Sequence, residues 1–234
     1  MTEAQRRLTA IVEIVICSSV PTQLLLTVGL AAMGMSPVGP DGALTLPFIV
    51  TLSILDTILL VGLMVMFTRL HGESVRELWL GHRPIGKEVL YGVLLIPVVF
   101  LMVVVLLNVL RLSAPWLHNV PENPLEQLAE TPGGAAVFAL VAIIAGGVRE
   151  ELQRAFLLRR FERHLGGATV GVIVLSAAFG LGHVVQGWDA VITTGALGAF
   201  WAIVYLRRRS SVAPVVSHAG FNSLEILRVA VVGS

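Results

Sequence analysis

The chain has 234 residues, of which 56% are hydrophobic and only 13% are charged, and its formal net charge is +1. An average soluble domain carries about 25% charged residues, so this composition excludes a water-soluble surface and predicts an integral membrane protein. The basic residues lie in short loops rather than in one stripe, so the sequence predicts no nucleic acid partner.

The apolar residues fall into blocks with about the length needed to cross a hydrocarbon core. The blocks are continuous rather than alternating, and only 6% of residues are aromatic, which favours helices over a membrane β-barrel. We therefore predict an all-α bundle that forms one transmembrane domain over residues 1–234. About seven spans are expected, at roughly 8–33, 44–68, 88–110, 134–160, 168–186, 190–206 and 210–230.

The loops predict the orientation of this bundle. The positive-inside rule places the N-terminus in the cytoplasm, and an odd number of spans places the C-terminus outside. The many arginines and the single lysine are typical of a GC-rich bacterial genome, so we expect a bacterial inner (plasma) membrane protein. Twelve of the sixteen basic residues lie on the side expected to be cytoplasmic: Arg6, Arg7, Arg69, Arg76, Arg83, Lys87, Arg159, Arg160, Arg163, Arg207, Arg208 and Arg209.

The fourth span ends in a run of charges that is costly in lipid. Arg149, Glu150, Glu151 and Arg154 place four charges within six residues, and each costs about 2.5 to 3.5 kcal/mol at the centre of a span. Either glutamate can pair with Arg154, because spacings of three and four residues share a helical face. The alternative is that these side chains reach out to the headgroups.

Two histidines in later spans can meet these charges. Gly166-Gly167 predicts a helical turn, and Glu150 and His183 each lie about 16 residues from it. The two side chains are therefore level if both helices run unbroken. In the last span His218 and Asn222 are four residues apart and share one face. Asn222 could fix the tautomer of His218, donate to a developing oxyanion, or bond a neighbouring helix.

These residues resemble the signature of the intramembrane CAAX-protease and bacteriocin-processing family, which includes the type II prenyl-protein endopeptidase. Its motifs are Glu-Glu-x-x-x-Arg, Phe-x-x-x-His and His-x-x-x-Asn. The resemblance covers residues from about 133 to 227, and two motifs match in residue and spacing, from Phe179 to His183 and from His218 to Asn222.

The first motif departs from the family pattern, because Arg154 comes one residue early. If Arg154 is aligned with the family arginine, Arg149 and Glu150 occupy the two glutamate positions. If the glutamates are aligned instead, Ala155 occupies the arginine position. Both alignments stay open at the level of sequence.

The resemblance implies an endopeptidase in which a glutamate and a histidine activate a water, while the second histidine and the asparagine stabilise the oxyanion. It implies a peptide or protein substrate at the membrane, in addition to the lipid bilayer. The predicted catalytic residues are Glu150, Glu151, Arg154, His183, His218 and Asn222.

No cofactor is expected. Two histidines and a glutamate could bind zinc, but they lie in three different spans and no His-Glu-x-x-His motif occurs. Three other functions stay open. The chain could be a catalytically inactive family member that acts as an immunity or scaffold protein. It could bind haem through His183 and His218, or it could be a proton-coupled transporter that uses Asp56 and Glu13.

Overall fold

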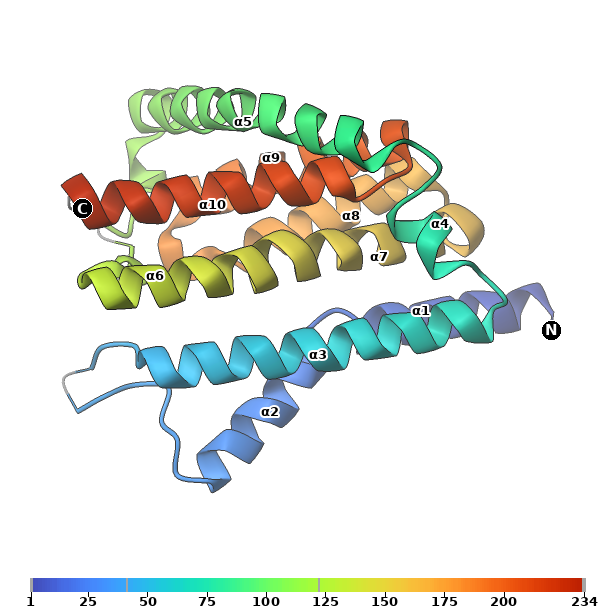
Figure 1. The fold of residues 1–234 in the computed structure, drawn as a ribbon, viewed down its shortest axis with the longest axis horizontal. Coiled ribbons are helices and arrows are strands. Elements are labelled where there is room, and N and C mark those ends of the chain that lie inside the picture. Colours follow the sequence, from blue (N-terminus) through green and yellow to red (C-terminus); the bar gives the residue numbers. More distant parts are fainter. Residues whose placement is uncertain (1, 41, 122, 233–234) are drawn as a thin grey trace.

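The structure is a computed structural model that describes residues 2–40, 42–121 and 123–232, and these residues form helices and no β-strand (Figure 1). Ten α-helices occur in the described part: α1 (Glu3–Ile16), α2 (Val20–Ala32), α3 (Leu46–Leu70), α4 (Val75–Trp79), α5 (Ile85–Ser113), α6 (Pro132–Val141), α7 (Glu150–His164), α8 (Ala168–Leu181), α9 (Trp188–Arg208) and α10 (Val212–Val232). A π-helix, Ala142–Arg149, joins α6 to α7.

Five helical segments of the described chain are long and apolar enough to cross a membrane: Glu3–Ala32, Leu46–Leu70, Ile85–Ser113, Pro132–His164 and Trp188–Arg208. The other two predicted spans are also helical, but α8 has only 14 residues and α10 carries polar and charged side chains along its length. The predicted all-α membrane bundle is confirmed.

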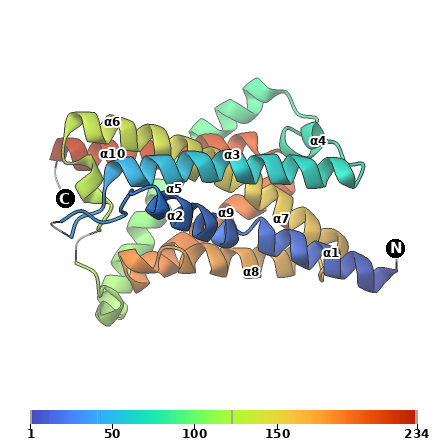
Figure 2. The ribbon, with the colours of Figure 1, turned by 90° about the horizontal axis from the view of Figure 1, so that it is seen from below.

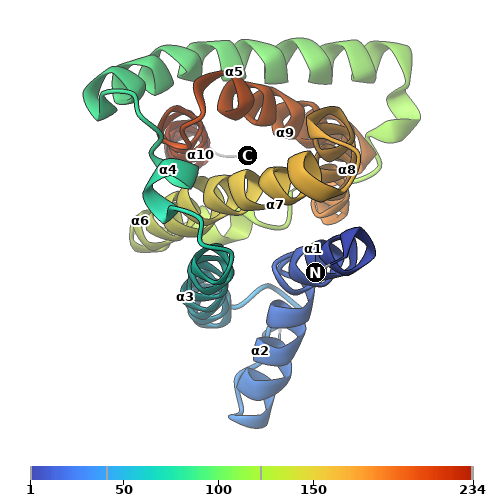
Figure 3. The ribbon, with the colours of Figure 1, turned by 90° about the vertical axis from the view of Figure 1, so that its right-hand side faces the viewer.

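The first predicted span, 8–33, is not one continuous helix. The chain bends between α1 and α2, where Ser19 adopts a left-handed conformation with φ of 72°. Gln153 stabilises the bend, because its Nε2 donates to the carbonyl of Cys17 (2.6 Å) and to Oγ of Ser19 (2.9 Å). As a result α2 diverges from the bundle, as the view along its axis shows (Figure 3).

The fourth span, predicted over 134–160, is continuous from Pro132 to His164 but is not α-helical throughout. Its π-helical part packs against α10, and a Cβ atom on Gly147 would lie 2.6 Å from Cβ of Ala219. On its other side this helix runs beside α3 (Figures 1 and 2). Short π-helical turns occur frequently at functional sites.

The fifth span is shorter than the predicted range 168–186, because α8 ends at Leu181. Gly180 packs so closely on α9 that a Cβ atom there would lie 2.4 Å from the carbonyl oxygen of Val191. His183 follows the helix and precedes a single 3-10 turn, Val184–Gln186. Glu150 and His183 are expected to lie level if both helices run unbroken. The second helix ends before His183, so this condition is not met.

The basic segments lie at the end of the bundle where the N-terminus lies, and the C-terminus lies at the opposite end (Figure 1). Arg160, one of the basic residues expected on the cytoplasmic side, is only 1% exposed. Its Nε donates to Glu13 over 2.5 Å and its Nη1 donates to Glu73 over 2.9 Å. These ion pairs connect α7 to α1 and to the segment that follows α3.

Candidate active site

A cavity of about 460 Å³ lies between α3, α5, the α6–α7 helix, α9 and α10. Most of its wall is apolar and includes Val103, Phe138, Leu197 and Phe221. The segment before α6 lines part of it with Asn123, Leu125, Glu126 and Ala129. Polar side chains also line the cavity: Arg149, Glu150, His183, His218 and Asn222, together with Ser53, Asn123, Glu126, Gln186, Thr193, Thr194 and Glu225.

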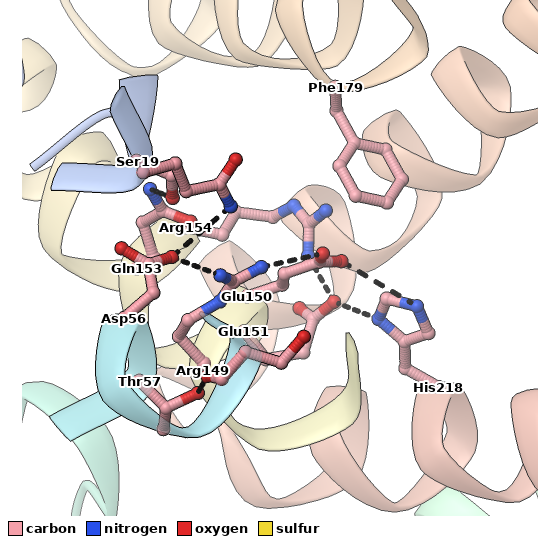
Figure 4. A network of polar contacts seen from close by, with 12 residues as sticks. Ser19, Asp56, Thr57, Arg149, Glu150, Glu151, Gln153, Arg154, Phe179 and His218 are labelled. Atoms are coloured by element: carbon pink, nitrogen blue, oxygen red, sulfur yellow. Dashed lines mark hydrogen bonds and ion pairs between the residues drawn. The ribbon is translucent and has the colours of Figure 1, made fainter. Parts of the chain in front are cut away.

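The two adjacent glutamates have different surroundings (Figure 4). Glu151 is 2% exposed, pairs with Arg154, and its Oε1 lies 2.8 Å from Nδ1 of His218. Glu150 lines the cavity, with its side chain 21% exposed and its Oε2 3.9 Å from Nε2 of His218. Both carboxylates therefore face His218, but of the two only Glu150 opens to the cavity.

The ring of His218 is fixed on several sides. It stacks on Trp201 with ring centroids 3.9 Å apart and planes 14° apart. Trp201 is itself held by a 2.9 Å hydrogen bond from its Nε1 to Oγ of Ser217. Because a carboxylate only accepts hydrogen bonds, Nδ1 of His218 carries the proton shared with Glu151, and Nε2 is the atom directed toward Glu150.

The tautomer of His183 is fixed by the backbone. Its Nδ1 lies 2.8 Å from the carbonyl oxygen of Phe179, which can only accept, so Nδ1 is the donor. Nε2 of a neutral His183 is then an acceptor. Its ring packs edge-on against that of Phe179, with centroids 4.9 Å apart. His183 lines the same cavity as Glu150 but forms no ion pair with it.

Asn222 lines the cavity one helical turn beyond His218, as the spacing predicts. It packs against the π-helix, where a Cβ atom on Gly146 would lie 2.6 Å from Nδ2 of Asn222. The absence of a side chain at Gly146 thus leaves room for the amide at the wall of the cavity.

Arg154 pairs with Glu151 across three residues, so the early arginine of the first motif still reaches a glutamate. The guanidinium lies 4.8 Å from the ring centre of Phe179, a distance at which a cation is attracted to an aromatic face. Ala155, the alternative arginine position, is completely buried in the apolar core. All six predicted site residues thus lie at or beside one cavity.

A comparison with known protein families adds to this geometry. Residues 132–224 match the model of a family described as type II CAAX prenyl endopeptidase Rce1-like. This part of the chain is similar to the Rce1-like family. The predicted resemblance, placed at about 133 to 227, is therefore confirmed. No curated protein and no solved structure matches the chain.

The site also includes two residues that the sequence did not assign to it: Arg149, which lies within the Rce1-like segment, and Asp56 on α3. Arg149 donates from Nη1 to Oδ2 of Asp56 on α3 over 2.5 Å, and from Nη2 to Oε1 of Glu150 over 3.2 Å. A carboxylate and an arginine in two apolar spans are each costly unless paired. This cost is the sequence signal that could have pointed to Asp56 and Arg149. It does not say which of the several charges in the apolar spans pair with one another.

The described part of the chain holds no group of three or more His, Cys, Asp or Glu side chains arranged to bind a metal ion. The donors around Glu150 are instead engaged with Arg149, Arg154 and one another. The expectation that this site needs no cofactor stays a prediction.

Proposed function

We propose that the protein is an intramembrane endopeptidase in which Glu150 and His183 activate a water molecule. One observation carries this proposal: of the two adjacent glutamates, Glu150 opens to the cavity that His183, His218 and Asn222 also line. The match of residues 132–224 to the Rce1-like family model supports the same chemistry.

In the proposed reaction, the Glu150 carboxylate takes a proton from water while Nε2 of His183 accepts the other hydrogen bond of that water. The hydroxide attacks the peptide carbonyl carbon, and a C–O bond forms. Glu150 then returns the proton to the amide nitrogen, and the C–N bond breaks. The products are a carboxylic acid and an amine, so one water is consumed for each bond cleaved.

The tetrahedral intermediate carries negative charge on the former carbonyl oxygen. Nε2 of a protonated His218 and the amide of Asn222 are the proposed donors to that oxyanion. Glu151 would stabilise the protonated ring from the opposite nitrogen, over the 2.8 Å contact to Nδ1. Preorganised donors of this kind are each worth about 10²-fold to 10³-fold in kcat.

The apolar wall of the cavity supports a substrate whose cleaved bond lies next to an apolar segment or a lipid. The proposal is tested by incubating the purified protein, in lipid vesicles, with a library of lipidated and leader-type peptides. Wild type should cleave a subset, and Glu150→Gln should lower kcat by about 10²-fold to 10⁴-fold. Glu162→Gln is the matched control, because Glu162 lies on the same helix outside the cavity, where it binds Arg209.

Cleavage at equal rates by wild type and Glu150→Gln, or no cleavage by either across the library, would overturn the proposal.

The other functions have their own readouts. A Soret band in the purified protein would indicate haem between His183 and His218. The two carboxylates that suggested proton transport, Asp56 and Glu13, are bound to Arg149 and Arg160, so ion pairing between helices accounts for them.

A further inference from the structure

Asp56 is completely buried on α3 and accepts three hydrogen bonds. Two come from α2: Thr22 Oγ1 donates to Oδ1 over 2.5 Å, and Gln23 Nε2 donates to Oδ2 over 3.2 Å. The third comes from Arg149, 93 positions later in the chain. This carboxylate therefore connects α2 and α3 to the Rce1-like segment (Figure 4).

Arg149 extends the connection to the cavity. The residue is 7% exposed, and its two terminal nitrogens bind Asp56 and Glu150 separately. Its Nε is buried with no hydrogen-bond partner among the described residues. Glu150 is consequently held on two sides: Oε1 faces Arg149, and Oε2 faces His218.

The charge on Asp56 affects what Arg149 does to Glu150. A lone arginine beside a carboxylate in a region of low dielectric favours the ionised form strongly and makes it a poor base. An arginine that already binds a buried carboxylate is largely neutralised. Such an arginine can orient Glu150 through its planar guanidinium. It favours the ionised form of the Glu150 carboxylate less strongly than a lone arginine would.

We propose that Asp56 and Arg149 are positioning residues for Glu150, which set the orientation and the basicity of its carboxylate. The inference rests on the proposed function, because it assigns a role toward the same base. It extends the site to α3, beyond the segment that matches the Rce1-like family.

The test measures kcat and KM as a function of pH for wild type, Asp56→Asn, Arg149→Lys and the double variant Asp56→Asn/Arg149→Gln. Asp56→Asn should lower kcat on the order of 10-fold to 100-fold with little change in KM. It should also move the acid limb of the profile to lower pH, because Arg149 then acts on Glu150 alone. The double variant removes the cation as well, so its acid limb should lie at higher pH than that of Asp56→Asn.

Other charged groups near Glu150 stay constant in this series, so the opposite directions report on the pair. They are Glu151, Arg154, His183 and His218 at the site, and Glu126 and Glu225 along the cavity. Arg149→Lys keeps the charge but cannot reach both carboxylates with a planar fork, and should lower kcat without the shift to higher pH.

Glu13→Gln is the matched structural control, because Glu13 forms the same kind of buried ion pair with Arg160 away from the cavity. It should lower the thermal stability and leave the pH profile unchanged. If Asp56→Asn and the double variant behave like Glu13→Gln, the positioning role is overturned, although Glu150→Gln remains inactive. If wild type itself cleaves nothing, the proposed function fails, and the positioning role fails with it. If Asp56→Asn does not fold, the double variant and Arg149→Lys decide the question.

Discussion

At the scale of single residues, neighbours in the sequence have different roles. Glu150 and Glu151 are chemically identical, and from their spacing either could pair with Arg154. In the structure Glu151 pairs with Arg154 and is sealed from the cavity, while Glu150 is left open to it. The sequence could name both glutamates but could not choose between them, because both directly follow the π-helix Ala142–Arg149, whose register differs from that of an α-helix.

Glu151→Gln tests the role assigned to the buried glutamate. The amide can still bond to Nδ1 of His218, but it can also present its NH₂ group, which does not stabilise a protonated ring. We expect kcat to fall by about 10²-fold to 10³-fold, the cost of one oxyanion donor. The free energy of unfolding should fall by about 3 to 5 kcal/mol, since Arg154 is left buried without its partner. Activity assays and thermal unfolding in detergent measure the two effects.

The double variant Glu151→Gln/Arg154→Gln separates these effects. Removing both charges relieves the unpaired cation, so the melting temperature should recover toward that of wild type while kcat stays low. Recovery of activity together with stability would show that Glu151 acts only by holding Arg154, and not through His218.

At the scale of elements, the apolar runs were sufficient to predict where helices occur but not where they bend or end. The break at Ser19 depends on a hydrogen-bonding side chain from α7, Gln153. Close to the end of α8, Gly180 packs directly against the backbone of α9. Both features involve contacts between helices that are distant in sequence, so the hydropathy of one stretch of chain does not predict them.

The contact between the π-helix and α10 gives a prediction about glycine. A Cβ atom on Gly147 would lie 2.6 Å from Cβ and 3.0 Å from Cα of Ala219, and the backbone of α10 cannot move aside cheaply. Gly147→Ala should therefore destabilise the fold by about 1 to 3 kcal/mol. It should also lower kcat, since it displaces the helix that carries His218. Thermal unfolding and peptide cleavage measure the two effects.

Gly133→Ala is the matched control, because a Cβ atom at Gly133 in α6 meets no atom within 4 Å. It should be neutral or slightly stabilising, as alanine is the better helix former. Equal melting temperatures for the two variants would contradict the close approach of α10 to the π-helix.

At the scale of the whole molecule, composition alone predicts a helical membrane protein, and the structure confirms it. The motif residues also converge, with all six at one cavity or beside it, although His183 reaches the cavity from beyond the end of α8 and not from an unbroken helix. The part that could not be predicted is the contribution of the N-terminal helices. Asp56 and Glu13 are isolated charges in the sequence. Asp56 pairs with Arg149 and Glu13 pairs with Arg160 only because α3 and α1 pack against the C-terminal segment.

The orientation in the membrane is a property of the whole chain and stays a prediction. The basic segments gather at the end of the bundle that holds the N-terminus (Figure 1), and translocating so many arginines is unfavourable. That end should therefore face the cytoplasm, in a bacterial inner membrane. Single cysteines in a Cys17→Ser background test it with a membrane-impermeant maleimide, at two positions that are both exposed, His82→Cys near α4 and Glu130→Cys before α6. Glu130→Cys should be labelled in intact spheroplasts and His82→Cys only after permeabilisation, whereas the reverse pattern would invert the topology and place the N-terminus outside.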